Sequence, residues 1–299
     1  MTIVWLLLAG LLSFTITGLF RRYALAKSIL DIPNNRSSHT VPTPSAGGIG
    51  VVITMIVSIS LLGIYIEINN QIAGFYQILL IGGLIIAGIG LIDDFRHVSA
   101  KWRLMIHVIV ASYTVIVLGI PSIEIGVVTI NPNIIIEIIF VIGMVWLINL
   151  YNFMDGIDGL AGTETIFVSG SVALIIYLGA SYANILVQPD EPINYSIILL
   201  LLILAVAVFG FLIWNWPPAK IFMGDVGSSY LGFIFGALLI YSSQTSILSI
   251  WTWLILLGIF IVDATITLIQ RFISGAQWYS AHRSHAYQNA ARQWGSHRK

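Results

Sequence analysis

The sequence predicts an all-α fold, a polytopic bundle of helices embedded in a membrane. Of its 299 residues, 58% are apolar and only 9% are charged, and the mean hydropathy is +0.95. Soluble domains have about a quarter of their residues charged, so this composition excludes a water-soluble globule. Apolar runs long enough to cross a bilayer recur at about nine places, which predicts about nine transmembrane helices in one membrane-embedded domain over residues 1–299.

The apolar runs follow one another from the N-terminus almost to residue 270. They are Thr2–Phe20, Gly47–Ile66, Phe75–Ile92, Trp102–Ile120, Ile134–Leu150, Gly162–Tyr182, Ile197–Trp214, Gly227–Tyr241 and Leu248–Ile269. Gly227–Tyr241 is the shortest run and has the weakest claim to be a full span. The first run has no basic segment before it and is followed by Arg21 and Arg22, so we interpret it as a retained span and not as a signal peptide.

The lysines and arginines lie in every second connection between the runs and in the C-terminal tail. They are Arg21, Arg22, Lys27, Arg36, Arg96, Lys101, Arg103, Lys220, Arg271, Arg283, Arg292, Arg298 and Lys299. The intervening connections, residues 67–74, 121–133, 183–194 and 242–246, contain neither lysine nor arginine. By the positive-inside rule, the N-terminus lies outside, the tail lies in the cytoplasm and an odd number of spans separates them.

Acidic motifs occur where three of the predicted spans meet the cytoplasm. Asp93 and Asp94 end the third span, Asp155 and Asp158 follow the fifth, and Asp225 precedes the eighth. Carboxylates about 5 Å apart repel by roughly 3 kcal/mol at an effective dielectric near 20, so a convergent cluster needs protons or a cation. Oxygen ligands without cysteine favour Mg²⁺, with Mn²⁺ as a substitute. The alternative is that each acid only marks a helix end, but several acids in glycine-flanked motifs on one face favour a site.

The longest of these motifs is Asn149-Leu-Tyr-Asn-Phe-Met-Asp-Gly-Ile-Asp-Gly-Leu-Ala161. Its amides and carboxylates recur every three residues, and neighbours three apart share a helix face, so Asn152, Asp155 and Asp158 can project together. The two glycines leave room for a ligand or another backbone to come close. In a chain this apolar, such a cluster indicates a site that binds something hydrophilic.

Candidate phosphate-binding and base-binding residues lie in two other cytoplasmic connections. Arg36 and His39 offer donors suited to phosphate oxygens, although an ordinary polar connector is the alternative. Asn215 supplies an amide, and Phe222 could stack on a base, near tryptophans that equally suit interface anchors. Asp225 could instead act only as the cap of a helix start.

The tail and the ninth run contain further polar candidates. His282, Arg283 and His285 could form a phosphate clamp, a general acid/base pair or a metal site, and the alternative is a solvated basic tail. Asp263 lies inside the ninth run, and an acid within the membrane is a functional candidate by default. A helix–helix hydrogen bond is the alternative for Asp263.

Together these motifs resemble the polyprenyl-phosphate N-acetylhexosamine-1-phosphate transferases, which form glycosyltransferase family 4. The similarity rests on Asp93-Asp94, Asn149–Ala161, Gly224-Asp-Val-Gly-Ser228, the late histidine motif and the loop around Arg36-Ser-Ser-His39. These motifs occur in family order between about residues 30 and 290. The loop favours the O-antigen-type initiating branch, which is related to the phospho-N-acetylmuramoyl-pentapeptide translocase.

The resemblance implies transfer of N-acetylhexosamine-1-phosphate from a UDP-sugar to undecaprenyl phosphate at the cytoplasmic face of the bacterial inner membrane. The products would be undecaprenyl-diphosphate-sugar and UMP, and the reaction would initiate O-antigen or a related cell-envelope polysaccharide. It implies Mg²⁺ held by Asp225, with Asp93 and Asp94 at the reacting centre through metal contact or activation of the lipid phosphate. No motif distinguishes N-acetylglucosamine, N-acetylfucosamine and N-acetylquinovosamine, and a homodimer is left open.

The remaining roles carried over from the family concern the substrates. Positions around the nucleotide and sugar are Asn152, Asp155 and the catalytic candidate Asp158, Asn215 matches an amide in the uridine region, and the segment with His282, Arg283 and His285 matches a phosphate-contacting or sugar-contacting loop. From the residues themselves, Phe222 could stack on the base, and Arg36, His39, Lys101 and His282 could neutralise phosphate charge.

Two departures from the family are visible. The translocase branch has adjacent histidines where this chain has His-Arg-Ser-His-Ala-Tyr-Gln, which disfavours a muropeptide substrate. Relatives also continue into at least one further span beyond the point that corresponds to Lys299.

Other classes of protein fit the sequence less well. A transporter, the main alternative, would place ionisable residues at mid-membrane, whereas here only Asp263 lies deep. An intramembrane aspartyl protease needs a Gly-x-Gly-Asp turn where this chain has Phe-Met-Gly-Asp225, and a CDP-alcohol phosphotransferase would need Asp-Gly-x-x-Ala-Arg. Zero net charge gives no case for nucleic-acid binding, and the absence of cysteine excludes thiolate chemistry.

Overall fold

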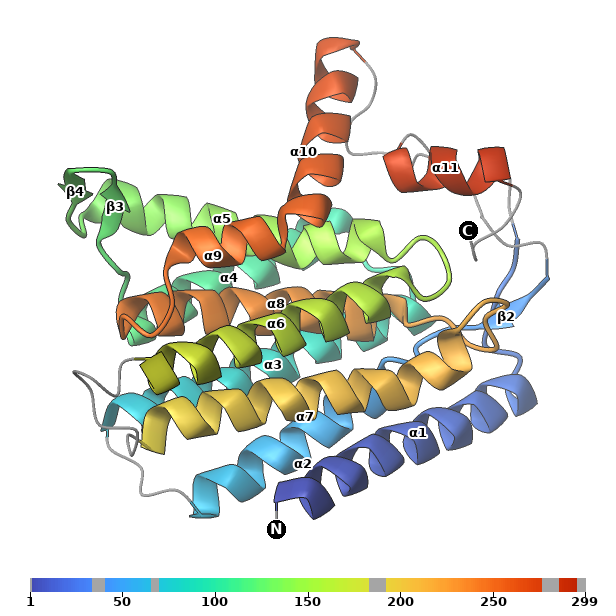
Figure 1. The fold of residues 1–299 in the computed structure, drawn as a ribbon. Helices are drawn as coiled ribbons and strands as arrows, with labels where there is room; N and C mark the ends of the chain where they lie inside the picture. The colour runs from blue at the N-terminus through green and yellow to red at the C-terminus, as the bar shows by residue number, and fades with distance from the viewer. Residues whose placement is uncertain (1, 34–40, 66–69, 183–191, 276–284, 295–299) are drawn as a thin grey trace.

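A computed structural model describes residues 2–33, 41–65, 70–182, 192–275 and 285–294 as a bundle of long helices (Figure 1). The helices are α1 (Thr2–Ala26), α2 (Ile49–Tyr65), α3 (Asn70–Phe95), α4 (Ala100–Leu118), α5 (Ile134–Met154), α6 (Leu160–Tyr182), α7 (Pro192–Asn215), α8 (Gly224–Gln244), α9 (Ile250–Leu256), α10 (Gly258–Ile273) and α11 (Ala286–Trp294). The all-α membrane fold predicted from composition is confirmed. Helices suit a bilayer because they satisfy their own backbone hydrogen bonds.

Two short hairpins, which were not predicted from the sequence, join helices at opposite ends of the bundle. β1 (Leu30–Asp31) pairs antiparallel with β2 (Thr43–Pro44) between α1 and α2, with Leu30 opposite Pro44. β3 (Ile123–Ile125) pairs antiparallel with β4 (Val128–Ile130) between α4 and α5. Gly126, with φ of 60°, lies in the turn between β3 and β4, where a left-handed backbone favours glycine.

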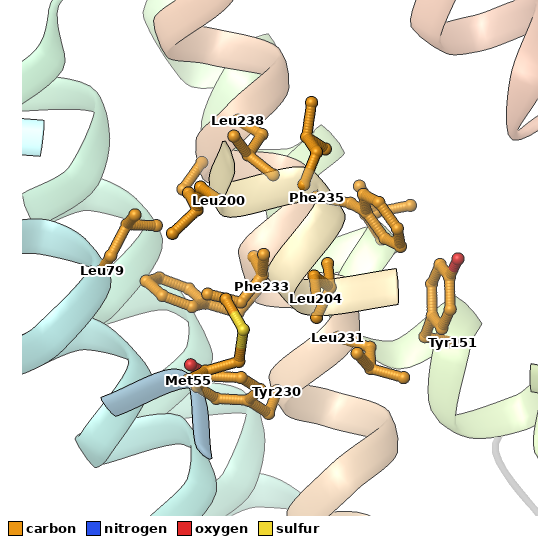
Figure 2. Packing of buried hydrophobic residues seen from close by; sticks show 14 of the residues in the cluster. Met55, Leu79, Tyr151, Leu200, Leu204, Tyr230, Leu231, Phe233, Phe235 and Leu238 are labelled. Carbon is orange, nitrogen blue, oxygen red and sulfur yellow. The ribbon is translucent and has the colours of Figure 1, made fainter. Parts of the chain in front are cut away.

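Helix α8 forms the centre of the bundle. In its most apolar stretch of 18 residues, 89% of the residues are buried, whereas the corresponding share in α1 is 17%. Helix α8 is therefore the most enclosed of the candidate spans, and α1 is a peripheral one. Figure 2 shows its side chains packed among residues of α2, α3, α5 and α7. The labelled residues are Met55, Leu79, Tyr151, Leu200, Leu204, Tyr230, Leu231, Phe233, Phe235 and Leu238. The run with the weakest claim to be a span is therefore the core helix.

Glycines bring neighbouring backbones into contact with α8. A Cβ atom on Gly48 would lie 2.4 Å from the Cα of Gly227, and one on Gly90 would lie 2.5 Å from the carbonyl oxygen of Asp225. Small residues at helix contacts are typical of membrane bundles, where close packing replaces the hydrophobic driving force. These contacts fix the start of α8 against α3 and the start of α2.

The ninth predicted span is wrong as a single helix. It is broken at Leu257 into α9 and α10, whose axes differ by 73°. The break falls at Leu257-Gly258, and glycine within a helix is less favourable than alanine because it loses more conformational freedom. Figure 1 shows α10 leaving the bundle, with α11 lying beyond it. Asp263 therefore belongs to the diverging helix α10.

The number of spans stays a prediction. In the described ranges, seven helices are long and apolar enough to cross a membrane, and the bent pair α9–α10 would make eight. The shorter apolar helix α2 occupies the remaining predicted position. The orientation of the bundle likewise stays a prediction.

Candidate active site

The acidic residues gather at the end of the bundle where α3 and α5 finish and α8 begins. Asp94, in the last turn of α3, accepts hydrogen bonds from the backbone N–H groups of Asp225 (2.9 Å) and Val226 (3.1 Å). A carboxylate at this position caps the helix and complements its dipole. Gly224 has φ of 74°, and a Cβ there would lie 2.6 Å from an Asp94 oxygen, so only glycine fits. Asp94, and not Asp225, caps α8.

The carboxylate of Asp225 is thereby left to face two other side chains. Asn152 in the last turn of α5 donates to one of its oxygens over 2.7 Å and also to the Ser228 hydroxyl over 3.2 Å. The other oxygen accepts a hydrogen bond from Arg103, which lies in the first turn of α4. Side chains from two other helices, α4 and α5, therefore hold this one carboxylate.

Arg103 joins Asp225 to Asp93. The same guanidinium nitrogen lies 2.5 Å from an Asp93 oxygen and pairs with Asp225. The second Asp93 oxygen accepts the backbone N–H of Val98 at 2.7 Å. Carboxylates from α3 and α8, far apart in sequence, thus converge on one position that a cation already occupies.

The loop after α5 carries the remaining aspartates of the cluster. Asp155 ends α5 and is half-buried. Burial raises the pKa of the Asp155 carboxyl well above its usual range, and the charges of Asp225, Asp94 and Asp158 raise it further. Asp155 therefore favours its protonated form, in which it can donate a hydrogen bond.

Asp158 and Asn215 tie this loop to the connection between α7 and α8. Asp158 accepts the backbone N–H of Ala219 at 3.0 Å. The Asn215 amide accepts the N–H of Gly159 at 2.9 Å and donates to the carbonyl of Ile221 at 2.9 Å. Asn215 is only 3% exposed, so the structure favours a positioning role for it over the predicted contact with a nucleotide.

Comparison with known proteins places the chain in a family. Residues 76–243, more than half of the sequence, match the family model described as "Glycosyl transferase family 4". The chain belongs to glycosyl transferase family 4. The matched region of this glycosyltransferase includes the acidic pair of α3, the long Asn/Asp motif and the start of α8, which are the elements that form the cluster. The family predicted from these motifs is confirmed.

The glycosyltransferase is also similar to a curated bacterial protein. It is 28% identical over 279 residues to the probable undecaprenyl-phosphate N-acetylglucosaminyl 1-phosphate transferase of Bacillus subtilis (strain 168). The similarity covers 91% of this chain and 72% of that relative.

Other predicted site residues of the glycosyltransferase are not among the side chains described above in the acidic cluster. Lys101 is exposed in the first turn of α4. The backbone of Phe222 joins β2 to the start of α2, since its N–H donates to the carbonyl of Pro44 and its carbonyl accepts from Gly47, both at 2.8 Å. Arg36, His39, His282 and Arg283 lie outside the described residues.

His285 lies beside α10. It is 4% exposed, and its Nδ1 atom is 3.5 Å from an Asp263 oxygen. Burial lowers the pKa of the His285 imidazole, while the Asp263 charge opposes that effect. Its ring stacks on Tyr287, with the ring centres 5.5 Å apart.

The donor set suits a magnesium ion only in part. Within the described ranges, no group of three or more histidine, cysteine or acidic side chains is arranged to hold a metal. Magnesium often takes only one or two carboxylates and completes its shell with water and substrate phosphates. Asp93 and Asp225 converge on one nitrogen, so this pair fits that pattern.

Arg103 is a residue that sequence reasoning assigned only to membrane topology. Its position could have indicated a place in the site, because it lies ten residues after Asp93, at the start of the helix that follows the acidic pair. A helix that begins beside an acidic helix end brings its first-turn side chains next to those acids.

An apolar cavity of about 260 Å³ lies between α5, α8, α9 and α10. Its lining includes Phe140, Met144, Leu147, Leu239, Leu254 and Leu257. The break at Leu257 therefore borders a space suited to hydrocarbon.

Proposed function

We propose that this glycosyltransferase moves N-acetylhexosamine-1-phosphate from a UDP-sugar to undecaprenyl phosphate and releases UMP. The observation that carries the proposal is the meeting of Asp93 and Asp225 on Arg103. It brings two carboxylates, which could hold a metal ion, and one cation, which could pair with phosphate, to a single position. The name of the Bacillus relative supports undecaprenyl phosphate as the acceptor and an N-acetylhexosamine 1-phosphate as the transferred group. The proposal includes the cytoplasmic face of the bacterial inner membrane and a role in starting O-antigen or a related polysaccharide.

The reaction needs charge neutralisation more than proton transfer. An oxygen of the lipid phosphate attacks the β-phosphorus of the UDP-sugar, a new phosphorus–oxygen bond forms, and the bond from that phosphorus to the bridging oxygen breaks. The bridging oxygen leaves with UMP. Both reactants are anionic, so positioning and electrostatic stabilisation supply most of the catalysis.

Magnesium, or manganese in its place, would be held by Asp225 and Asp93. When bound, it would supply Lewis-acid charge stabilisation and a template for the phosphates. Asn152 orients the Asp225 carboxylate, and Asp94 fixes the helix start that carries it. Arg103 pairs with both carboxylates in the structure, and we expect it to pair with substrate phosphate when a metal ion takes its place between them.

The other predicted residues complete the proposed substrate site. Asp155, whose pKa is raised by burial, would in its protonated form donate a hydrogen bond to a substrate oxygen. Asp158 would shape the loop around the nucleotide and sugar. Cationic or hydrogen-bonding groups that would meet the phosphates are Arg36, His39, Lys101, His282, Arg283 and His285.

The polyprenyl chain needs an apolar path beside this site. The cavity between α5, α8, α9 and α10 has apolar lining residues and borders the outward-bending helix. Because the polyprenyl chain already lies in hydrocarbon in the bilayer, such a cavity would position the chain by close packing and would add little hydrophobic free energy.

The test is a vesicle assay with a panel of UDP-sugars, undecaprenyl phosphate and either Mg²⁺ or EDTA, read as UMP release. Asp225→Asn and Asp93→Asn should each abolish turnover and leave the protein inserted and folded. Glu137→Gln, at the opposite end of α5, is the matched control and should keep the wild-type rate. Turnover that persists in EDTA would contradict the metal role, and wild-type turnover in either aspartate variant would remove that residue from the site.

A further inference from the structure

Helix α11 is fastened to α10 by one acidic side chain. One Asp263 oxygen accepts the backbone N–H of Ala286 at 2.9 Å, and the other accepts that of Tyr287 at 3.3 Å. The first N–H groups of a helix have no partner within the helix, so this carboxylate satisfies them and favours the helix dipole. Thr267 donates to Asp263 from one turn further along α10, at 3.2 Å. Asp263 thus caps a helix that begins 23 residues later.

From α11, Tyr287 reaches the end of α5. Its hydroxyl donates to the backbone carbonyl of Phe153 over 2.9 Å. That carbonyl belongs to the last turn of α5, where carbonyl groups lack partners within the helix. Figure 1 shows α11 lying beside this end of the bundle and apart from the packed helices. Tyr287 therefore connects α11 to the segment that carries the aspartates.

The loop after α5 is shaped to receive this tyrosine. A Cβ atom on Gly156 would lie 2.0 Å from the Tyr287 hydroxyl oxygen and 3.3 Å from the Gln288 amide nitrogen. Only a residue without a side chain permits that approach. Gly156 follows Asp155 directly and precedes Asp158 by two residues, so Tyr287 stands at the centre of the acidic loop.

Electrostatics agree with this closeness. Burial raises the pKa of the Tyr287 phenol, and the charges of Asp155 and Asp263 raise it further. Tyr287 is thus near both the acid of the loop and the acid that caps its own helix.

We propose that Asp263 is a positioning residue for sugar-phosphate transfer, which seats Tyr287 against Gly156 by capping α11 and thereby sets the acidic loop for the UDP-sugar. This inference rests on the proposed function. Asp263 acts through α11 and does not itself touch the substrates. When the cap is removed, the docked state of α11 becomes a smaller fraction of the population, and the apparent affinity for the UDP-sugar falls in proportion.

The first test compares Asp263→Ala with Asp263→Asn in the vesicle assay. Asparagine keeps one acceptor oxygen and can retain the shorter bond from Ala286, so Asp263→Asn should raise KM for the UDP-sugar less than Asp263→Ala, which should raise it about fivefold to tenfold. KM for undecaprenyl phosphate should change much less. Glu124→Ala, an exposed acid on β3, is the control and should change neither constant. Equal rises in both KM values, or no rise, would overturn the proposal.

The second test uses the fit between Gly156 and Tyr287. Gly156→Ala alone should impair transfer, because its methyl group collides with the phenol oxygen. Tyr287→Phe alone should be mild, since it removes one hydrogen bond. The double variant should recover part of the lost activity, because the phenylalanine lacks that oxygen. Additive losses in the double variant would overturn the proposed contact.

A third measurement is independent of activity. The sequence has no cysteine, so spin labels can be placed at Asn289→Cys on α11 and Phe167→Cys on α6 without background. Asp263→Ala should broaden the distance distribution and Asp263→Asn should preserve it. An unbroadened distribution in Asp263→Ala would refute the cap. A broadened distribution with unchanged KM would refute the positioning role. If wild-type protein shows no transfer while the labels respond as expected, the proposed function fails and the cap stands.

Discussion

Replacing Arg103 by methionine removes the positive charge between Asp93 and Asp225 and keeps most of the side-chain volume. Both carboxylates contact one guanidinium nitrogen, so without it they face each other unpaired. Two charges about 5 Å apart repel by roughly 3 kcal/mol at an effective dielectric near 20. The Arg103 side chain is 30% exposed, so solvent screening reduces this figure, and we take about 1.4 kcal/mol.

That energy appears as a change in metal affinity. In the wild type a divalent cation has to displace Arg103, whereas in Arg103→Met it meets an uncompensated pair of carboxylates. A gain of about 1.4 kcal/mol corresponds to tenfold tighter binding. Turnover should nevertheless fall, because the cation that we propose pairs with substrate phosphate is lost.

The assay is Mn²⁺ binding to detergent-purified protein, followed by electron paramagnetic resonance of the free ion, with UMP release measured in parallel. Arg103→Lys should stay near the wild-type affinity because it keeps the charge. Lys101→Met removes a positive charge two residues earlier and should change Mn²⁺ affinity little. If Arg103→Met binds Mn²⁺ no more tightly than wild type and turns over normally, Arg103 does not share the metal position.

Three further predictions concern stability. Asp94→Ala should lower the thermal midpoint by removing a helix cap worth about 0.5–2 kcal/mol, while Asp94→Asn should retain most of it; equal midpoints would rule out the cap. The raised pKa of Asp155 means that the folded state holds its proton as pH rises above the ordinary value of 3.8, so stability falls with pH through that window. The midpoint of Asp155→Asn should therefore fall less steeply with pH than that of wild type, and parallel slopes would contradict the shift. Gly90→Ala should abolish monodisperse folded protein, whereas Gly88→Ala, with nothing within 4 Å of the added carbon, should elute normally in size exclusion; similar profiles would contradict the close contact.

The helices were predictable because the bilayer requires long apolar runs, and each predicted run corresponds to a helix or a bent pair of helices. The break at Leu257 was not predictable, because the residues on both sides of it are apolar and the bend depends on what α9 packs against. Trp253 in α9 donates to the Ser242 hydroxyl of α8 at 2.8 Å, a contact that fixes α9 but not α10. Hydropathy does not carry that information.

The convergence of Asp93 and Asp225 followed from placing their motifs on one side of the membrane. The separate role of each aspartate within the cluster could not be predicted from the sequence. Asp94 caps α8 through hydrogen bonds between residues about 130 positions apart, which no local pattern encodes. Asp225 occupies the sequence position of a cap, yet its carboxylate faces Asn152 and Arg103. The role of Asp263 was not predictable for the same reason, because the helix that it caps is α11 and not α10, the helix to which it belongs.

The glycine contacts around α8 divide the molecule into a fixed part and a part that can move. Backbone meets backbone where α2, α3 and α5 touch α8, and a Cβ on Gly232 would lie 2.6 Å from the carbonyl oxygen of Leu147. These contacts join backbone to backbone, so we expect the aspartate-bearing ends to change their spacing little during a catalytic cycle. We expect admission of a reactant and departure of a product to be accommodated beside α11, which hydrogen bonds of Asp263 and Tyr287 attach to α10 and α5.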